Sequence, residues 1–391
     1  MNVDMKSLRL TLVSETYTPQ VNGVSRTLDR LVRYLASRGD RVQLIIPSYE
    51  GVSSVPPTVE KSEWSAFRLP FYKEVLLPVA RSATVRRTME AFCPDIVHIA
   101  TEGPLGLAAL RAARAMGVTT VGSYHTNFAQ YLSDYGAGML EPLSWRYLRW
   151  FHNQTCATFC PTPSIRDLLV EKQFDNVRIW GRGVDCGRFD PGKRDPAQRQ
   201  RLGVGPDDLL IVYAGRLAAE KNLQMLLDAW QMLPRETPCR LLLIGDGPLR
   251  GRLEKMADDR VIFTGYRHGE ELARLYACGD LFAFPSLTET FGNVILEAMA
   301  SGMPAVGFDV PGPRDIIRHE ATGLIVNEIS AYALGNALLK LSASPNSLRA
   351  MGTAARRYAE EQTWDNIHNG LLNDYAEIMK NAALQPAASY A

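Results

Sequence analysis

Short runs of apolar and β-branched residues alternate with amphipathic helical segments along the chain. These runs predict strands at residues 8–13, 42–46, 95–100, 118–122, 209–214, 241–244, 261–264, 281–284 and 305–307. Helices are predicted between them, for example at residues 25–37 and 105–116, which end at Gly39 and Gly117. Alternating strands and helices are typical of parallel sheets with crossover helices, so we expect an α/β protein.

The pattern changes at residues 181–205, which are rich in Gly, Pro, Arg and Asp and lack a long apolar face. Such a composition is typical of a connection between domains. We therefore predict a doubly wound domain at residues 1–185, a linker at 186–205 and a second domain at 206–363. Residues 364–391 are expected to form a helix that crosses back to the first domain, followed by a tail.

Length and charge narrow the class of protein. A chain of 391 residues is too long for one ordinary core, and 43 Lys and Arg against 42 Asp and Glu leave a net charge of +1. That balance argues against nucleic-acid binding by bulk electrostatics. Because the beginning of the sequence shows no signal-peptide pattern and no apolar run reaches roughly 20 residues, we expect a cytoplasmic protein.

Metal and redox chemistry find little support in the sequence. The six cysteines lack zinc-site spacing, and there is neither an Asp-x-Asp pair nor a His and Asp cluster at ligand spacing. Gly245-Asp-Gly-Pro248 lacks the third glycine of a dinucleotide fingerprint. We expect neither a metal nor a cofactor.

The densest group of candidate residues follows the predicted strand at 281–284. A polar loop leads to Gly292, which begins a helix, so the N–H groups of Phe291, Gly292 and Asn293 lie at a helix N-terminus that favours an anion. Glu289 lies before this helix and Glu297 in its second turn. Carboxylates accept hydrogen bonds from vicinal hydroxyls, so the segment suits a ligand with a sugar on each side of a phosphate. The alternative is that both glutamates merely face solvent.

Cations are expected near the same edge of the second domain. Arg216 and Lys221 follow the strand at 209–214, after a turn at Gly215, and suit a diphosphate. A surface salt bridge is the competing interpretation for either residue.

The first domain contributes two candidates at strand ends. Gly23 lies at a strand-to-helix turn, where a glycine allows a ligand to approach the backbone. His125 follows the strand at 118–122 and is expected at the edge of a cleft between the domains.

Together these motifs closely resemble glycosyltransferase family 4, retaining enzymes that use nucleotide sugars. The most specific feature is the Glu289 and Glu297 pair around Phe291-Gly-Asn293, and segments 214–217, 245–248 and 310–316 support it. The resemblance implies the GT-B fold, in which two Rossmann-like domains face each other across a cleft. The first domain would bind the acceptor and the second the nucleotide sugar.

The resemblance also implies roles for individual residues. Arg216 and Lys221 would hold the donor diphosphate, joined by backbone amides near Gly292 and Gly23. These cations would support departure of the diphosphate and so take part in catalysis.

Further roles concern the sugar and the base of the donor. Glu297 would bind the ribose and Glu289 the donor sugar, while His125 would approach the transferred sugar. The base would lie against the turn that ends at Arg267.

Segments 14–23, 124–126 and 180–185 suggest a subgroup. They resemble GDP-mannose-dependent α-mannosyltransferases acting on membrane glycolipids, and also sulfoquinovosyl- and glucuronosyl-diacylglycerol synthases, which use UDP-sugars. We expect a retaining hexosyltransferase that moves mannose from GDP-mannose to a lipid or glycan hydroxyl. The alternatives are a UDP-sugar-dependent diacylglycerol glycosyltransferase, a nucleotide-sugar 2-epimerase and a non-catalytic sugar-binding protein.

One segment raises the question of a membrane partner. Residues 143–151 mix Leu143, Tyr147 and Trp150 with arginines, which suits a peripheral face on an anionic membrane, the inner face of the cytoplasmic membrane. The same spacing is typical of a helix stripe packed against a core, and we favour that interpretation from the sequence.

Overall fold

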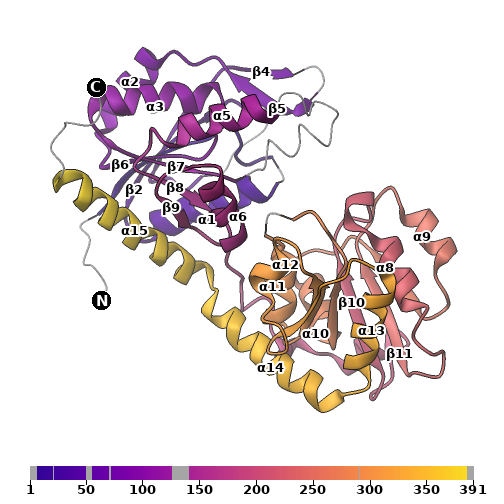
Figure 1. The fold of residues 1–391 in the computed structure, drawn as a ribbon. Coiled ribbons are helices and arrows are strands. Elements are labelled where there is room, and N and C mark those ends of the chain that lie inside the picture. Colours follow the sequence, from indigo (N-terminus) through magenta and orange to yellow (C-terminus); the bar gives the residue numbers. More distant parts are fainter. Residues whose placement is uncertain are drawn as a thin grey trace. The chain divides into compact units, whose positions relative to one another are not determined.

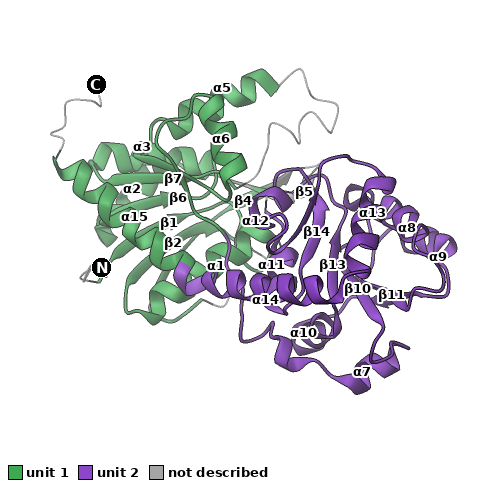
Figure 2. Ribbon diagram, turned by 60° about the horizontal axis from the view of Figure 1, so that its bottom comes forward, with its two compact units in different colours: residues 1–181, 367–391 green, residues 182–366 purple. Residues whose placement is uncertain are grey.

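The computed structural model describes residues 7–20, 22–49, 55–69, 72–125, 141–289 and 291–384. The chain divides into two compact units, one of residues 1–181 and 367–391 and the other of residues 182–366 (Figure 2). Each unit is built on its own parallel sheet with helices on both faces (Figure 1).

The first unit has a seven-stranded sheet in the order β3-β2-β1-β6-β7-β8-β9. Its strands are β1 Arg9–Val13, β2 Arg41–Pro47, β3 Val59–Trp64, β6 Ile96–Ile99, β7 Thr119–Ser123, β8 Ala157–Cys160 and β9 Val177–Ile179. Every neighbouring pair is parallel, which requires a crossover between successive strands. A separate antiparallel hairpin consists of β4 Ala66–Leu69 and β5 Tyr72–Pro78.

Two sets of helices cover this sheet. The helices of the unit are α1 Gly23–Ser37, α2 Ser82–Phe92, α3 Pro104–Met116, α5 Glu141–His152, α6 Pro163–Glu171 and most of α15 Trp364–Leu384. Apolar side chains of α1 and α15 share one core cluster, and those of α2 and α3 share another with Phe151 of α5. Burying both faces explains why the central strands are nearly continuous apolar runs.

The long helix α15 is fixed to the first unit by polar contacts as well. Arg178 forms ion pairs with Asp374 at 2.7 Å and with Glu377 at 2.9 Å. The buried His98 ring hydrogen-bonds to Tyr375 on one side and to Ser123 on the other. Burial lowers the pKa of His98 to about 3, so the ring is neutral and can donate from one nitrogen and accept at the other.

The second unit has a six-stranded sheet in the order β12-β11-β10-β13-β14-β15. Its strands are β10 Leu209–Ala214, β11 Cys239–Ile244, β12 Val261–Gly265, β13 Leu281–Phe284, β14 Ala305–Phe308 and β15 Gly323–Val326. Its helices are η2 Pro191–Lys193, α7 Pro196–Arg201, η3 Ala219–Lys221, α8 Leu223–Trp230, α9 Arg250–Met256, α10 Gly269–Cys278, α11 Asn293–Ala300, α12 Pro313–Ile316, α13 Ala331–Ser342 and α14 Pro345–Glu361.

Residues 186–205, expected as a linker, belong to the second unit. Their Arg199 is buried and donates to the backbone carbonyls of Cys278 and Asp208, each at 2.6 Å. It also pairs with Asp280 at 3.0 Å. The polar residues of this segment form hydrogen bonds with backbone groups of the second unit. The apolar periodicity of the sequence does not reveal such contacts.

No helix within the described residues is both long and apolar enough to span a bilayer.

Candidate active site

Two glycines, Gly215 and Gly245, follow strands β10 and β11 and allow the backbone to pack closely at the candidate site. Gly215 has φ +153°, and a Cβ on it would lie 2.7 Å from the Tyr213 hydroxyl oxygen. Gly245 has φ +146°, and a Cβ there would lie 1.9 Å from the Gly215 carbonyl oxygen. Because only glycine permits this approach, the two strand ends lie close together and direct Arg216 outward.

Lys221 and Glu289 form the central contact of the site. The Lys221 ammonium donates to Oε1 of Glu289, and the Ser286 hydroxyl donates to the same oxygen at 3.1 Å. The Lys221 and Glu289 side chains are 23% and 17% exposed, so the pair is shielded yet reachable from solvent. The residue predicted to hold a diphosphate and the residue predicted to hold a sugar therefore lie in direct contact.

A hydrogen bond from the Asn222 side chain joins the two segments that carry this pair. Asn222 adopts a left-handed conformation with φ +54°, and its side-chain amide donates to the Pro285 carbonyl at 3.3 Å. Asn tolerates this conformation better than most residues. The turn after β10 is thereby tied to the loop after β13, two strands that are neighbours in the sheet.

Glu297 is held separately, by helix α10. The Tyr276 hydroxyl donates to Oε2 of Glu297 at 3.2 Å. Burial, and then the nearby Glu297 charge, raise the pKa of Tyr276 well above its usual value, so the phenol remains a donor. One oxygen of Glu297 is thus oriented by a buried tyrosine.

The N-terminus of α11 lies between the two glutamates in sequence. Gly292 precedes the helix with φ +93°, and Asn293, its first residue, is exposed. Gly312 packs against this turn, since a Cβ on it would lie 3.0 Å from both the Glu289 Cβ and the Phe291 carbonyl oxygen. The arrangement leaves the first N–H groups of an eight-residue helix beside Glu289, a position that favours an anion.

Two predicted site residues of the second unit, Arg216 and Arg267, have side chains that are not held against the Lys221–Glu289 pair. Arg216 is exposed, and its carbonyl accepts a hydrogen bond from the Tyr213 hydroxyl at 3.1 Å. Arg267 follows β12 and pairs with Glu271 of α10 at 3.2 Å. Neither guanidinium has a contact with the Lys221–Glu289 pair that would fix it there.

Gly23 and His125 both belong to the first unit. Gly23 is the first residue of α1, it is exposed, and a Cβ on it would meet no atom within 4 Å. His125 follows β7, is 7% exposed and packs its ring 5.5 Å from that of Trp180. Both lie at carboxyl ends of strands or just beyond them, where such sheets bind ligands.

Glu15 is a residue that the sequence analysis did not select. Its Oε1 accepts from the backbone N–H groups of Leu105 at 2.8 Å and Gly106 at 2.9 Å, and the Thr101 hydroxyl donates to Oε2. Although the residue as a whole keeps some exposed surface, its carboxyl group is enclosed. Burial raises its pKa to about 7, and the neighbouring Glu102 adds to the rise. Glu15 therefore clamps the loop that precedes Gly23 onto the N-terminus of α3.

Tyr276, Ser286 and Gly312 were also missed as parts of the site. Tyr276 stands in an apolar stretch, which is the signal that sequence offers for a buried polar partner, whereas the buried Ser286 stands in a polar loop that gives no such signal.

Two family models match most of the chain. Residues 208–344 match the model described as glycosyl transferases group 1, and residues 21–188 match the model described as glycosyltransferase family 4.

Curated relatives extend over nearly the full length. A GDP-mannose-dependent alpha-mannosyltransferase of Mycobacterium tuberculosis is 33% identical over 98% of this chain and 100% of its own. Sulfoquinovosyl transferase SQD2 of Arabidopsis thaliana is 33% identical over 90% of this chain and 70% of its own. Alpha-monoglucosyldiacylglycerol synthase of Streptococcus pneumoniae is 28% identical over 87% and 79% of the two chains.

Solved structures agree on the fold. Sucrose-phosphate synthase from Thermosynechococcus elongatus superposes with a TM-score of 0.76 at 19% identity, covering 95% of this chain and 99% of its own. HepE of Anabaena in complex with UDP gives 0.74 at 16% identity, covering 95% and 100%. With two Rossmann-like domains of the GT-B type and full-length relatives at 33% identity, the chain belongs to glycosyltransferase family 4 and is a glycosyltransferase.

Proposed function

We propose that the protein transfers mannose from GDP-mannose to a lipid or glycan hydroxyl, with retention of the anomeric configuration. The observation that carries this proposal is the contact between Lys221 and Glu289 beside the N-terminus of α11. It joins a diphosphate-binding cation, a sugar-binding carboxylate and an anion-favouring helix end in one place. The name of the mycobacterial relative supports mannose as the sugar and GDP as the leaving group.

In the proposed mechanism the leaving group carries much of the catalysis. The bond from the anomeric carbon to the diphosphate oxygen breaks while the acceptor oxygen bonds to the same face of that carbon. The acceptor proton passes to the departing diphosphate. Lys221, Arg216 and the α11 amides stabilise the negative charge that develops there.

The two glutamates would recognise hydroxyl groups on either side of the diphosphate. Glu289 would exchange part of its contact with Lys221 for hydroxyls of the sugar, and Glu297, oriented by Tyr276, would accept from the ribose. Arg267 would lie near the base. Gly23 and His125 are proposed to complete the donor site from the first domain.

A second donor class is favoured by two of the relatives. The name of one relative points to sulfoquinovose as the transferred sugar, and the name of the other points to a glucosylated diacylglycerol. UDP-sugars are the donors that the family resemblance implies for this subgroup. The polar residues named above would serve either donor, since they address the diphosphate and the hydroxyls common to both.

A screen of donors tests the proposal and separates the two classes. Thermal unfolding would be followed with GDP-mannose, UDP-glucose, UDP-glucuronate and UDP-sulfoquinovose, because a ligand at 100 times its Kd stabilises by about 2.7 kcal/mol. We expect the largest shift from GDP-mannose, with GDP released when a glycolipid acceptor is added. A larger thermal shift from a UDP-sugar would mean that a UDP-sugar, and not GDP-mannose, is the donor. No thermal shift with any of the four would overturn the proposal.

The relative named for diacylglycerol also leads us to propose a peripheral position on the inner face of the cytoplasmic membrane. Fractionation of cells that make the full chain tests this, and recovery wholly in the soluble fraction at low salt would contradict it.

A further inference from the structure

Helix α5 exposes a stripe of large apolar side chains. Leu143, Tyr147 and Trp150 are 61%, 37% and 45% exposed, although their spacing is that of a packed stripe. Phe151, the next residue, is buried, and the Tyr147 hydroxyl donates to the Glu102 carbonyl at 2.5 Å. The packing interpretation is therefore wrong for Leu143 and Trp150.

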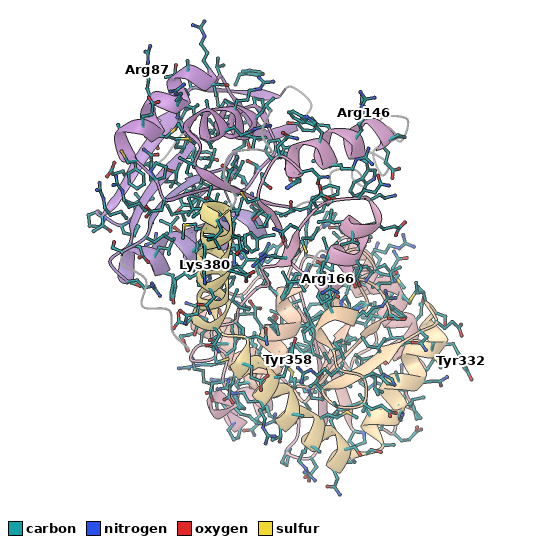
Figure 3. All side chains as sticks on the ribbon, turned by 60° about the vertical axis from the view of Figure 1, so that its left-hand side comes forward. Arg87, Arg146, Arg166, Tyr332, Tyr358 and Lys380 are labelled. Carbon is teal, nitrogen blue, oxygen red and sulfur yellow. The ribbon has the colours of Figure 1, made fainter. Side chains whose placement is uncertain are left out.

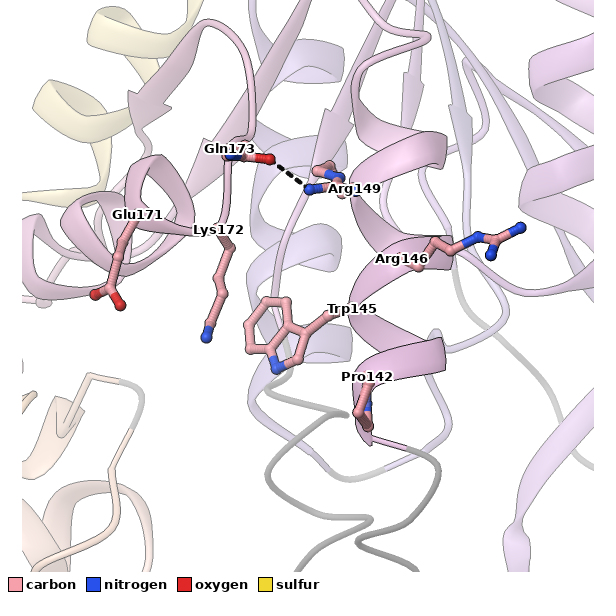
Figure 4. A pocket seen from close by; sticks show the side chains of 7 residues that line it. All are labelled: Pro142, Trp145, Arg146, Arg149, Glu171, Lys172 and Gln173. Carbon is pink, nitrogen blue, oxygen red and sulfur yellow. Dashed lines mark hydrogen bonds between the residues drawn. The ribbon is translucent and has the colours of Figure 1, made fainter.

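Beside this stripe lies a cavity of about 210 Å³ between α5 and the C-terminal end of α6 (Figure 4). Its charged lining residues are Arg146, Arg149, Lys172 and Glu171. None of these four forms an ion pair with another residue in the part of the chain that the structure describes. The charged side chains of the lining therefore sum to +2, and a further carboxylate, that of Glu141, accepts from the indole N–H of the lining Trp145 at 3.3 Å.

The cations hold defined positions around the cavity. The Lys172 ammonium lies 5.5 Å from the ring centroid of Trp145, and Arg149 donates to the Gln173 side chain at 2.6 Å. Figure 4 shows Arg146 directed away from these groups, toward the outside of α5. In Figure 3, Arg146 and Arg87 of α2 both project from the upper side of the first unit, so further positive charge lies on that side.

We propose that α5 and the end of α6 form a docking site for an anionic lipid bilayer, with one lipid phosphate held between Lys172 and Arg149. Leu143 and Trp150 enter the interfacial layer, and Arg146 contacts neighbouring headgroups. Tyr147 stays at the base of this surface, because its hydroxyl donates to the Glu102 carbonyl at 2.5 Å. Trp favours the interfacial layer because it has an apolar body and a polar tip. Uncompensated cations beside exposed apolar side chains match an anionic surface, whereas a protein partner would need matching carboxylates.

The inference rests on the proposed function, since it supplies the surface on which a lipid acceptor would be met. The cavity lies wholly within the first unit and contains none of the residues proposed to bind the donor.

Flotation of the full chain with vesicles tests the site. The parent is expected to float with vesicles of phosphatidylglycerol and phosphatidylcholine at low salt and to remain behind with phosphatidylcholine alone. Each basic residue near such a surface contributes roughly fivefold in affinity, so Arg149→Gln with Lys172→Gln should weaken binding about 25-fold. Glu171→Gln should strengthen it about fivefold.

Two matched variants in the second unit serve as controls. Lys340→Gln removes a charge that is 63% exposed, and Tyr332→Asn removes an aromatic side chain that is 67% exposed. Both should bind like the parent, whereas Trp150→Asn should bind more weakly. Thermal unfolding of every variant verifies that it is folded.

Three results would overturn the docking site: no flotation of the parent, parental binding by the double variant, or weaker binding by Glu171→Gln. Binding of inorganic phosphate by a parent protein that does not bind vesicles would also overturn the docking site, and would indicate a site for a soluble anion. Turnover of the donor with a water-soluble acceptor distinguishes the two proposals. If the docking site alone is wrong, this turnover persists, and if the proposed transfer is wrong, no variant shows it.

Discussion

The two units share an architecture, but Glu289 in the second unit and Glu15 in the first have opposite surroundings. In the second unit Glu289 is partly exposed and contacts Lys221, a cation that an anionic ligand can share. In the first unit the Glu15 carboxyl group is enclosed and is satisfied by backbone N–H groups of α3. The second unit thus keeps a charged pair within reach of solvent, where we propose that the donor binds, whereas the first unit uses a carboxyl group to hold a loop. Substitution of Lys221 or Glu289 should therefore affect turnover, whereas substitution of Glu15 should affect stability.

The largest effect is expected from Lys221→Ala. Loss of the cation proposed to stabilise the departing diphosphate should lower kcat/KM on the order of 10²- to 10³-fold, with little change in thermal stability. Steady-state assays of GDP release measure this. Lys340→Ala, which removes an exposed ammonium 3.2 Å from Glu320, is the control. Turnover within a few-fold of the parent would show that Lys221 does not contact the leaving group.

Glu15→Gln should change how stability depends on pH. The pKa of Glu15 is about 7 in the folded protein against 4.5 for the free side chain, so the folded state binds the proton more tightly. Stability of the parent should therefore fall as pH rises from 4.5 to about 7, by up to about 3 kcal/mol. Glutamine imitates the protonated acid and should remove this fall.

Urea unfolding across that pH range compares the Glu15→Gln variant with the parent. Glu60→Gln, at an exposed carboxylate paired with Arg41, is the control and should follow the parent. A difference between Glu15→Gln and the parent that stays constant with pH would contradict the raised pKa of the Glu15 carboxyl group.

Tyr276→Phe should raise the KM for the donor about tenfold while leaving kcat within about twofold. The variant removes the hydroxyl that orients Glu297, whose proposed role is in binding and not in bond cleavage. Tyr375→Phe is a matched change at a buried tyrosine that contacts His98 in the first unit. Tyr375→Phe should reduce stability without changing KM. An equal effect of both variants on KM would contradict the role of Tyr276 in orienting Glu297.

The smallest effect is expected from Gly23→Ala. A Cβ at this exposed residue meets no atom within 4 Å, so stability should change by less than about 1 kcal/mol. If the donor approaches this backbone, its KM should rise a few-fold. Gly370→Ala in α15, where a Cβ likewise meets nothing within 4 Å, is the control. An unchanged KM for Gly23→Ala would exclude close approach of the donor there.

Much of the fold could be predicted because the central strands are apolar on both faces. The predicted strands at 209–214 and 281–284 coincide with β10 and β13. Strand β3, Val59–Trp64, was missed because it lies at an edge of the sheet and carries three charged residues in six. Edge strands face solvent and lose the apolar signal.

The sequence predicts a set of candidate site residues but not the contacts between them. The spacing of Glu289 and Glu297 selects both as candidates, whereas the partner of Lys221 lies 68 residues away along the chain. Tyr276 reaches Glu297 from another helix. Such pairs depend on strand order in the sheet, which local pattern does not specify.

The exposure of the apolar stripe on helix α5 also could not be predicted from the sequence. An apolar stripe at helical spacing has the same sequence whether it packs against a core or faces outward, and only the structure shows that Leu143 and Trp150 are exposed.

The most direct test of the account is a double-mutant cycle on Lys221 and Glu289, with the donor Kd measured by titration calorimetry. Lys221→Ala and Glu289→Gln should each weaken binding at least about tenfold, and the double variant should be no weaker than the worse single one. That result would show that the pair holds the donor as one unit. Binding by either single variant that equals the parent's, or losses that simply add, would contradict it.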